Sequence, residues 1–272
     1  MEALLNAFSE SVPQSDSEYM GEDGLLHCSI CHQKTERIAC IPSLGINRKV
    51  RCICDCKRKE IEAHEDQKRQ EELDRQRRIC FSETNMANWN FQNDDRRNAK
   101  LSDAMKNYAQ NFTEFRRDGK GLLLYGTVGT GKTYYAACIA NALIDMGFTV
   151  VLTNFTKILN QLQDFKTEKQ KYIDGFNRYS LMIIDDLGVE RSTEFAREQV
   201  FNIIDSRYRA GLPFIVTTNL TAEEIKKPQD VSYSRIYDRI LERCHPIEVS
   251  GVSRRRQNVK DGFAEMQAKF GL

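Results

Sequence analysis

The residues with the clearest chemical signature follow the pattern G-x-x-x-x-G-K-T: Gly126, Thr127, Val128, Gly129, Thr130, Gly131, Lys132 and Thr133. The glycines let the backbone curl so that successive N–H groups point at phosphate oxygens, and the helix that follows adds its positive N-terminal dipole. Lys132 is expected to reach the β and γ phosphates, and the Thr133 hydroxyl to bind magnesium. Because the pattern follows an expected strand and opens an expected helix, it predicts a site for ATP and Mg²⁺.

A pair of carboxylates, Asp185 and Asp186, ends the apolar run 181–184. Open parallel sheets bind their ligands at the carboxyl ends of the strands, so these acids are expected near the phosphates. We therefore predict that Asp185 binds the metal and that Asp186 polarises the attacking water. The alternative is an ordinary turn with solvated acids at the end of a strand.

Two further segments could complete a hydrolytic site. Asn219 ends the apolar pattern 214–218 and is a candidate to lie between the γ phosphate and the attacking water; a strand-ending Asn turn is the alternative. Arg235 and Arg239 lie four residues apart, on one face of an expected helix. Such a pair is either a solvated face, an ion-pair network, or an arginine supplied to the ATP of a neighbouring subunit.

A metal site is indicated by five cysteines that fall within 29 positions: Cys28, Cys31, Cys52, Cys54 and Cys56. Zinc needs four ligands in a tetrahedron, which four of these thiolates, or three with His27 or His32, would supply. Cys28 and Cys31 with two of the last three are favoured, and the spacing does not choose among those three. Uncoordinated thiols and an iron–sulfur cluster are the alternatives.

These candidate residues need elements that hold them in place, and the hydrophobic pattern predicts such elements. Strands are expected at 121–125, 148–152, 181–185 and 213–218, and helices at 132–146, 155–165 and 194–209. Strands that alternate with helices of this length predict an α/β fold, with a parallel sheet covered by helices on both faces. Cys138 and Cys244 fall in expected helical segments and are predicted to be small core residues.

The composition is that of a globular chain. Of 272 residues, 40% are hydrophobic and 29% are charged, which excludes a wholly disordered or collagen-like chain. The net charge of +1 predicts no general attraction to nucleic acid, so any such contact must come from local patches. No apolar window approaches the length of a membrane span, and no basic region of a secretory signal precedes Lys34. The protein is therefore expected to be cytoplasmic, where clustered cysteines favour a metal over disulfides.

The composition changes along the chain and predicts three parts. Residues 1–56 hold the cysteines and few periodic apolar positions, as expected where a metal replaces a core. Residues 57–80 are dominated by charges of both signs, which predicts a solvated helix or linker. Residues 81–272 form the globular part that carries the phosphate pattern.

Together these motifs resemble an AAA+ ATPase of the DnaC/DnaI helicase-loader type and its relative, the IstB transposition helper. The resemblance covers about residues 80–257 and the cysteine module. It rests on the segment 86–91 (MANWNF), on the run 185–191 (DDLGVER) and on the box 235–239 (RIYDR). It implies a P-loop AAA+ parallel sheet sandwiched by helices. It also implies that Asn219 is the sensor-1 residue, Arg239 the trans-acting arginine finger and Arg255 a sensor-2-like arginine. Asp186 stands where Glu is usual, so slow ATP hydrolysis is expected.

The resemblance further implies the partners. The N-terminal zinc module would contact a hexameric replicative DNA helicase, the ATPase domain would handle single-stranded DNA, and the protein would self-assemble with ATP or helicase. From the basic residues around its second cysteine group, the zinc module could equally bind nucleic acid itself. The region 155–179 interleaves basic and aromatic residues that could contact such DNA, although aromatics at this spacing are more often core. The rival functions are an IstB-like helper of a DNA transposase and a zinc-dependent adaptor that binds ATP but scarcely hydrolyses it.

Overall fold

The computed structural model describes residues 17–41, 45–81, 84–164, 168–188, 193–228, 230–254, 266–267 and 269–270. The chain divides into two compact units, Met1–Glu71 and Glu72–Leu272. The predicted sensor-2-like residue, Arg255, lies outside the described residues. No helix among the described ranges is both long enough and apolar enough to cross a membrane.

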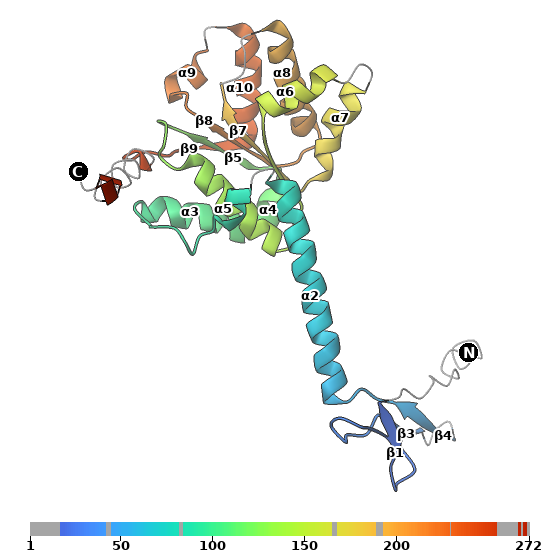
Figure 1. The fold of residues 1–272 in the computed structure, drawn as a ribbon. Coiled ribbons are helices and arrows are strands. Elements are labelled where there is room, and N and C mark those ends of the chain that lie inside the picture. The colour runs from blue at the N-terminus through green and yellow to red at the C-terminus, as the bar shows by residue number, and fades with distance from the viewer. Residues whose placement is uncertain are drawn as a thin grey trace. The chain divides into compact units, whose positions relative to one another are not determined.

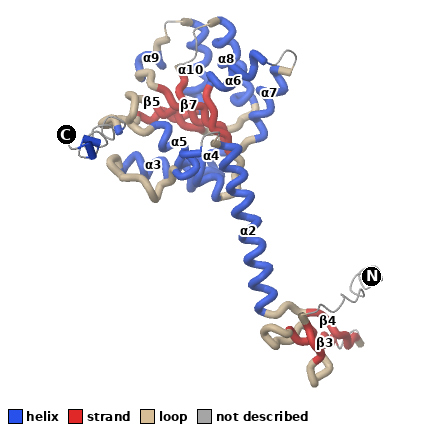
Figure 2. Tube along the Cα trace, in the orientation of Figure 1, coloured by secondary structure: helices blue, strands red, loops and turns tan. Residues whose placement is uncertain are grey.

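The first unit is built from two short antiparallel strand pairs, drawn red in Figure 2. Strand β1 (Glu18–Met20) pairs with β2 (Leu26–Cys28), and β3 (Glu36–Ile41) pairs with β4 (Ile46–Arg51). Among the described residues of this unit, the buried hydrophobic side chains are Leu25, Cys28 and Cys54. Three such side chains are too few for a hydrophobic core, so another interaction must hold these strands together.

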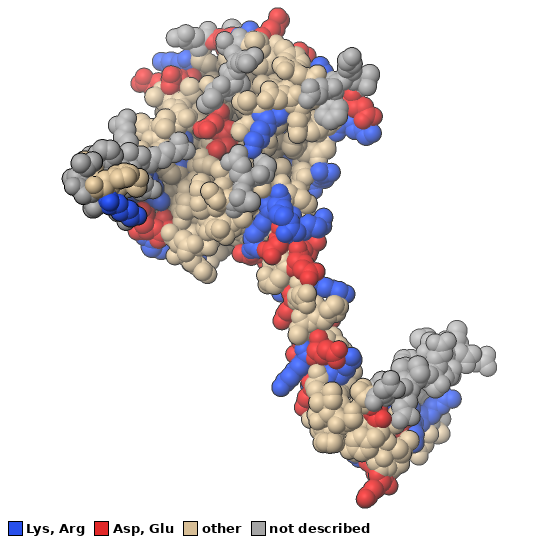
Figure 3. All heavy atoms as spheres, viewed as in Figure 1, with Lys and Arg blue, Asp and Glu red and all other residues tan. Residues whose placement is uncertain are grey.

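The charged segment forms helix α2 (Asp55–Cys80), one of the two forms that the sequence allowed. The helix buries only its last residue, Cys80, and Figure 3 shows basic and acidic side chains interspersed along it. Several of these charges pair one turn apart, as Lys57 does with Glu60 and Arg75 with Glu72. Each such pair stabilises a solvated helix by about 0.2–0.5 kcal/mol.

The second unit is organised around a five-stranded sheet with the order β6-β7-β8-β5-β9. All its pairs are parallel, which confirms the predicted sheet. The strands are β5 (Gly121–Tyr125), β6 (Val150–Asn154), β7 (Leu181–Leu187), β8 (Phe214–Thr218) and β9 (Cys244–Glu248).

Strand β9 corrects one expectation. Cys244 does not lie in a helix but begins β9, where it pairs with Gly121 and is buried. The strand lies at the edge of the sheet, so Pro246 costs no hydrogen bond to a further strand. The prediction that Cys244 is a small core residue is confirmed, whereas the predicted helix there is wrong.

Helices cover both faces of this sheet (Figure 1). One layer contains α3 (Ala99–Gln110), α4 (Phe112–Arg117) and α5 (Lys132–Asp145). The other contains α6 (Phe155–Asp164), α7 (Lys169–Gly175), α8 (Glu194–Arg209), α9 (Ala222–Lys226) and α10 (Val231–Arg243). Alternate residues of β5 serve the two layers: Leu122 and Leu124 join the cluster with α3 and α5, and Leu123 joins the cluster with α6, α8 and α10. The sandwich of helices about a parallel sheet confirms the predicted fold class.

Candidate functional site

The phosphate pattern forms the turn between β5 and α5, as its position in the sequence predicts. Gly126, Gly129 and Gly131 have φ angles of 136°, 84° and 106°, which side chains with a Cβ rarely adopt. At Gly126 a Cβ atom would also lie 2.6 Å from the carbonyl oxygen of Val249. The glycines are therefore required both by the backbone conformation and by the segment that packs against the loop.

Lys132 begins α5 and its side chain lies within the curled loop. Its Nζ donates hydrogen bonds to the carbonyl oxygens of Gly126 and Thr127, each at 2.8 Å, and the residue is 5% exposed. A buried ammonium group that donates to neutral carbonyls can exchange them for the stronger acceptors of a phosphate. The position fits the predicted contact with the β and γ phosphates.

The two predicted magnesium-binding groups meet in the structure. Thr133 Oγ1 donates to Oδ1 of Asp185 at 2.9 Å and lies 3.2 Å from Oδ2, although 52 residues separate them in the sequence. Burial raises the pKa of Asp185, against the lowering effect of hydrogen bonds from Thr217 and Thr133. A bound cation would favour the ionised carboxylate, so this hydroxyl–carboxylate pair fits the oxygen ligands that Mg²⁺ prefers.

Asp186, the residue before the end of β7, and Asn219, the residue after β8, approach each other. Asn219 Nδ2 lies 3.5 Å from Asp186 Oδ1, and Asp186 has a φ of 56°, in the left-handed region that non-glycine residues seldom occupy. Both residues line the cavity at the phosphate loop. The structure therefore brings the predicted water-polarising acid and the predicted sensor-1 amide to the same place.

That cavity has a volume of about 410 Å³. Its lining includes the predicted residues Val128, Gly129, Gly131, Lys132, Thr133, Asp186 and Asn219. It also includes residues that no motif marked as ligand-binding: Trp89, Asp95, Arg97, Tyr134 and Arg254. Trp89 stands in the segment 86–91 that supported the resemblance, and Arg254 adjoins the predicted Arg255, so the sequence held a signal for these two. Asp95 and Arg97 gave none, because only the folded chain brings them to the loop.

Arg254, in the C-terminal segment, contacts the phosphate loop. Its backbone N–H donates to the Gly129 carbonyl at 2.9 Å, and its guanidinium lies 3.0 Å from Asp95 Oδ1 and 5.4 Å from the centre of the Tyr134 ring. These contacts hold a positive charge beside the cavity, where the sequence predicted one from Arg255.

Arg239 lies on α10 and is not among the residues that line this cavity. Its Nε forms a 2.8 Å ion pair with Asp205 Oδ1, and its guanidinium stacks over Phe201, 4.4 Å from the ring centre. Asp205 also pairs with Arg209. Within one chain Arg239 thus belongs to an ion-pair network, one of the alternatives that its sequence position allowed. Its action on the nucleotide of another subunit stays a prediction.

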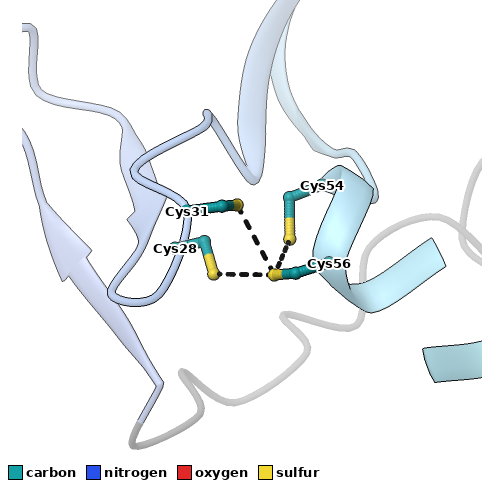
Figure 4. Close-up of side chains that lie close together, drawn as sticks. All are labelled: Cys28, Cys31, Cys54 and Cys56. Carbon is teal, nitrogen blue, oxygen red and sulfur yellow. Dashed lines mark hydrogen bonds between the residues drawn. The ribbon is translucent and has the colours of Figure 1, made fainter. Parts of the chain in front are cut away.

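Four of the five clustered cysteines converge in the first unit. The sulfur atoms of Cys28, Cys31, Cys54 and Cys56 all lie within 4.8 Å of one another (Figure 4). Cys56 Sγ is 3.4 Å from Cys28 Sγ, 3.5 Å from Cys31 Sγ and 3.2 Å from Cys54 Sγ. Sulfur ligands of one tetrahedral zinc ion would be about 3.8 Å apart at the usual Zn–S distance. The donor set therefore fits zinc.

Cys52 is the predicted metal ligand that the structure leaves out of this group. Its N–H donates to the Thr35 carbonyl and its thiol to the Lys34 carbonyl at 3.3 Å, so it continues the strand pairing of the module. The chain then turns into α2 and carries Cys54 and Cys56 to the other two thiols. Neither histidine alternative belongs to this group: the ring of His27 contacts Asp23, and the ring of His32 contacts the hydroxyl of Tyr19.

The neighbouring thiols, Cys54 first, raise the pKa of Cys56, whereas the pKa of Cys28 is lowered. Hydrogen bonds from the backbone N–H groups of Cys31 and Ile30, together with the Cys56 thiol, lower the pKa of Cys28 to about 6. Thiolate is the form that binds zinc. Since the described residues of this unit bury few hydrophobic side chains, a metal at this point would stabilise it.

We expect Cys54→Ser to lose the zinc and Cys52→Ser to keep it. Serine removes one of four converging sulfurs in the first variant, whereas the second removes a thiol that contacts only a carbonyl. Metal analysis of the purified full-length chains should give about one zinc per chain for the unmodified protein and for Cys52→Ser. Equal zinc content in all three proteins would remove Cys54 from the ligand set.

A phosphate loop between a strand and a helix of a parallel sheet, with an acid at the end of a neighbouring strand, is the arrangement of P-loop nucleotide-binding proteins. Within that class the chain belongs to the family of IstB-like ATP binding proteins, whose model matches residues 57–262.

Comparison with curated proteins finds relatives of two kinds. Replicative helicase loader DnaI of Bacillus subtilis is 31% identical, over 50% of this chain and 48% of that protein. Replicative helicase loader DnaC of Escherichia coli K12 is 27% identical, over 46% of this chain and 52% of that protein. A putative insertion sequence ATP-binding protein of Sinorhizobium fredii is 28% identical, over 53% of this chain and 49% of that protein. The chain thus spans about half the length of the curated relatives it matches.

Solved structures agree with the fold. A crystal structure of DnaI superposes with a TM-score of 0.54 at 25% identity and covers 66% of this chain and 99% of that chain. A crystal structure of the DnaC helicase loader gives a TM-score of 0.54 at 23% identity, with coverage of 62% and 100%. The second unit therefore has the AAA+ fold that the motifs predicted.

Proposed function

We propose that the protein is an ATP-dependent loader that places a hexameric replicative DNA helicase on single-stranded DNA when replication begins. The observation that carries the ATPase part is the meeting of Thr133, Asp185, Asp186 and Asn219 at the phosphate loop. The similarity to DnaI and DnaC, both named as replicative helicase loaders, supports the choice of client.

In this proposal the chain's own residues divide the work of hydrolysis. Lys132 exchanges its two carbonyl partners for phosphate oxygens, and Thr133 and Asp185 hold Mg²⁺, which neutralises phosphate charge when bound. Asp186 polarises the attacking water, with Asn219 beside it. Because an aspartate reaches less far than the glutamate usual at this position, hydrolysis is slow and serves as a switch between two states of the assembly.

In this proposal the cysteine module is the part that binds the helicase. The zinc-bound first unit docks on the helicase, while the ATPase unit contacts single-stranded DNA and other copies of the chain in the cytoplasm. The nearest rival is an ATPase helper of a DNA transposase, supported by the relative from Sinorhizobium fredii. It would use the same active site, and the zinc module is the feature that favours the loader.

Light scattering after size-exclusion chromatography tests this choice. The full-length protein, mixed with the replicative helicase of its host, is expected to form a complex whose stability differs between ATP and ADP. Cys54→Ser should weaken the complex and Cys52→Ser should not, because only the first removes a converging thiol. Absence of a complex with either nucleotide would favour the transposition helper.

A further inference from the structure

The two acids of the active site lie in a β-bulge. In the pairing of β7 with β8, Ile184 is opposite Val216 and Leu187 is opposite Thr218. Asp185 and Asp186 together therefore face a single residue, Thr217. A bulge of this kind turns side chains away from the regular alternation of a strand. It accounts for the left-handed φ of Asp186, which directs this residue to the cavity.

Thr217 holds both members of this bulge with one hydroxyl. Its Oγ1 donates to Asp185 Oδ1 at 2.6 Å and accepts from the Asp186 N–H at 2.9 Å. The residue is completely buried. A hydroxyl is the smallest side-chain group that can donate and accept at once, so an apolar residue of the same shape would lose both contacts.

The neighbouring threonine provides a contrast. Thr218 is equally buried on the same strand, but its Oγ1 donates to the carbonyl of Leu187 and contacts neither acid. Two adjacent hydroxyls thus stabilise the same bulge, and only one of them reaches the carboxylate that would bind the metal.

We propose that Thr217 is a positioning residue for ATP hydrolysis, which sets the carboxylate of Asp185 for Mg²⁺ and the backbone of Asp186 for the attacking water. This inference rests on the proposed ATPase function. In that function Thr133 turns its hydroxyl to the metal, which leaves Thr217 as the donor that keeps Asp185 oriented. Loss of the Thr217 hydroxyl frees the carboxylate to rotate and leaves the N–H of Asp186 without this acceptor.

The test compares three variants of the full-length chain: Thr217→Val, Thr217→Ser and Thr218→Val. For Thr217→Val we expect the turnover number to fall about 10- to 100-fold, the range for a lost hydrogen bond to a charged group, with a higher Mg²⁺ concentration at half-maximal activity. Thr217→Ser keeps the hydroxyl and should restore both values. Thr218→Val should lower thermal stability without changing the Mg²⁺ requirement. Should Thr217→Val fail to fold, Thr217→Ala takes its place.

The outcomes separate this inference from the function on which it rests. If Thr217→Val and Thr218→Val have the same Mg²⁺ requirement and the same turnover number, Thr217 has only a structural role and the inference is overturned. If the unmodified protein hydrolyses no ATP, the ATPase proposal fails instead. In that case the affinity for ATP is measured by calorimetric titration, once in Mg²⁺ and once in a chelator. The inference requires that Thr217→Val reduce the gain in ATP affinity that Mg²⁺ provides, and an unchanged gain overturns it.

Discussion

Lys132→Ala is expected to abolish measurable ATP binding, with affinity at least about 100-fold lower, because it removes a charge-assisted contact to the phosphates. Lys132 supplies a buried positive charge at the centre of the phosphate loop. The chain's one tryptophan, Trp89, lines the same cavity, so its fluorescence reports nucleotide binding directly. Calorimetric titration gives the dissociation constant independently.

Lys106→Ala is the matched control for this result. Lys106 is an exposed lysine of α3, so its removal changes the net charge equally and leaves the phosphate loop intact. Circular dichroism should show both variants folded. Binding of ATP by Lys132→Ala with the affinity of the unmodified chain would show that the loop is not the nucleotide site.

Arg239→Ala is expected to leave ATP binding unchanged and to lower DNA-stimulated turnover by at least about 100-fold, since arginine fingers contribute roughly 10³–10⁵ to turnover. Arg239 lies outside the cavity of its own chain, so its contribution must come in an assembly. Arg209→Ala is the matched control, because Arg209 pairs with the same carboxylate, Asp205, and carries no assigned role. Steady-state phosphate release with single-stranded DNA measures both variants.

Mixing two inactive variants gives the sharper form of this prediction. Arg239→Ala keeps an intact nucleotide site, and Lys132→Ala keeps an intact arginine. An arginine that acts on a neighbouring subunit would let the mixture hydrolyse ATP although neither variant does so alone. Normal turnover by Arg239→Ala, or a mixture as inactive as its parts, would contradict the assignment.

The parallel sheet and the residues at its carboxyl edge could be predicted because both depend on local patterns. The apolar runs before Gly126, Asp185 and Asn219 mark buried strands, and parallel strands bring their ends together. The start of β6 was less predictable: Phe148 looks strand-like, yet its N–H donates to the Leu143 carbonyl and closes the preceding helix. The strand therefore begins at Val150.

Features that depend on contacts between distant segments could not be predicted. Strand β9 has a pattern too short and too mixed to mark it, and only its pairing with β5 reveals it. The spacing of Cys52, Cys54 and Cys56 gave no reason to leave out Cys52, because the choice depends on where the chain turns into α2. Thr217 likewise has the sequence signal of an ordinary strand residue, because its contacts depend on the bulge in the strand opposite it.

Loading of the host's replicative helicase on closed circular single-stranded DNA, which a ring cannot enter from an end, tests the loader function. We predict that the full-length protein with ATP increases the amount of helicase retained on the circles, and that Lys132→Ala does not. Equal retention of helicase with the protein, with Lys132→Ala and with helicase alone would contradict the loader function. The same ATP site would then act on a partner other than the helicase.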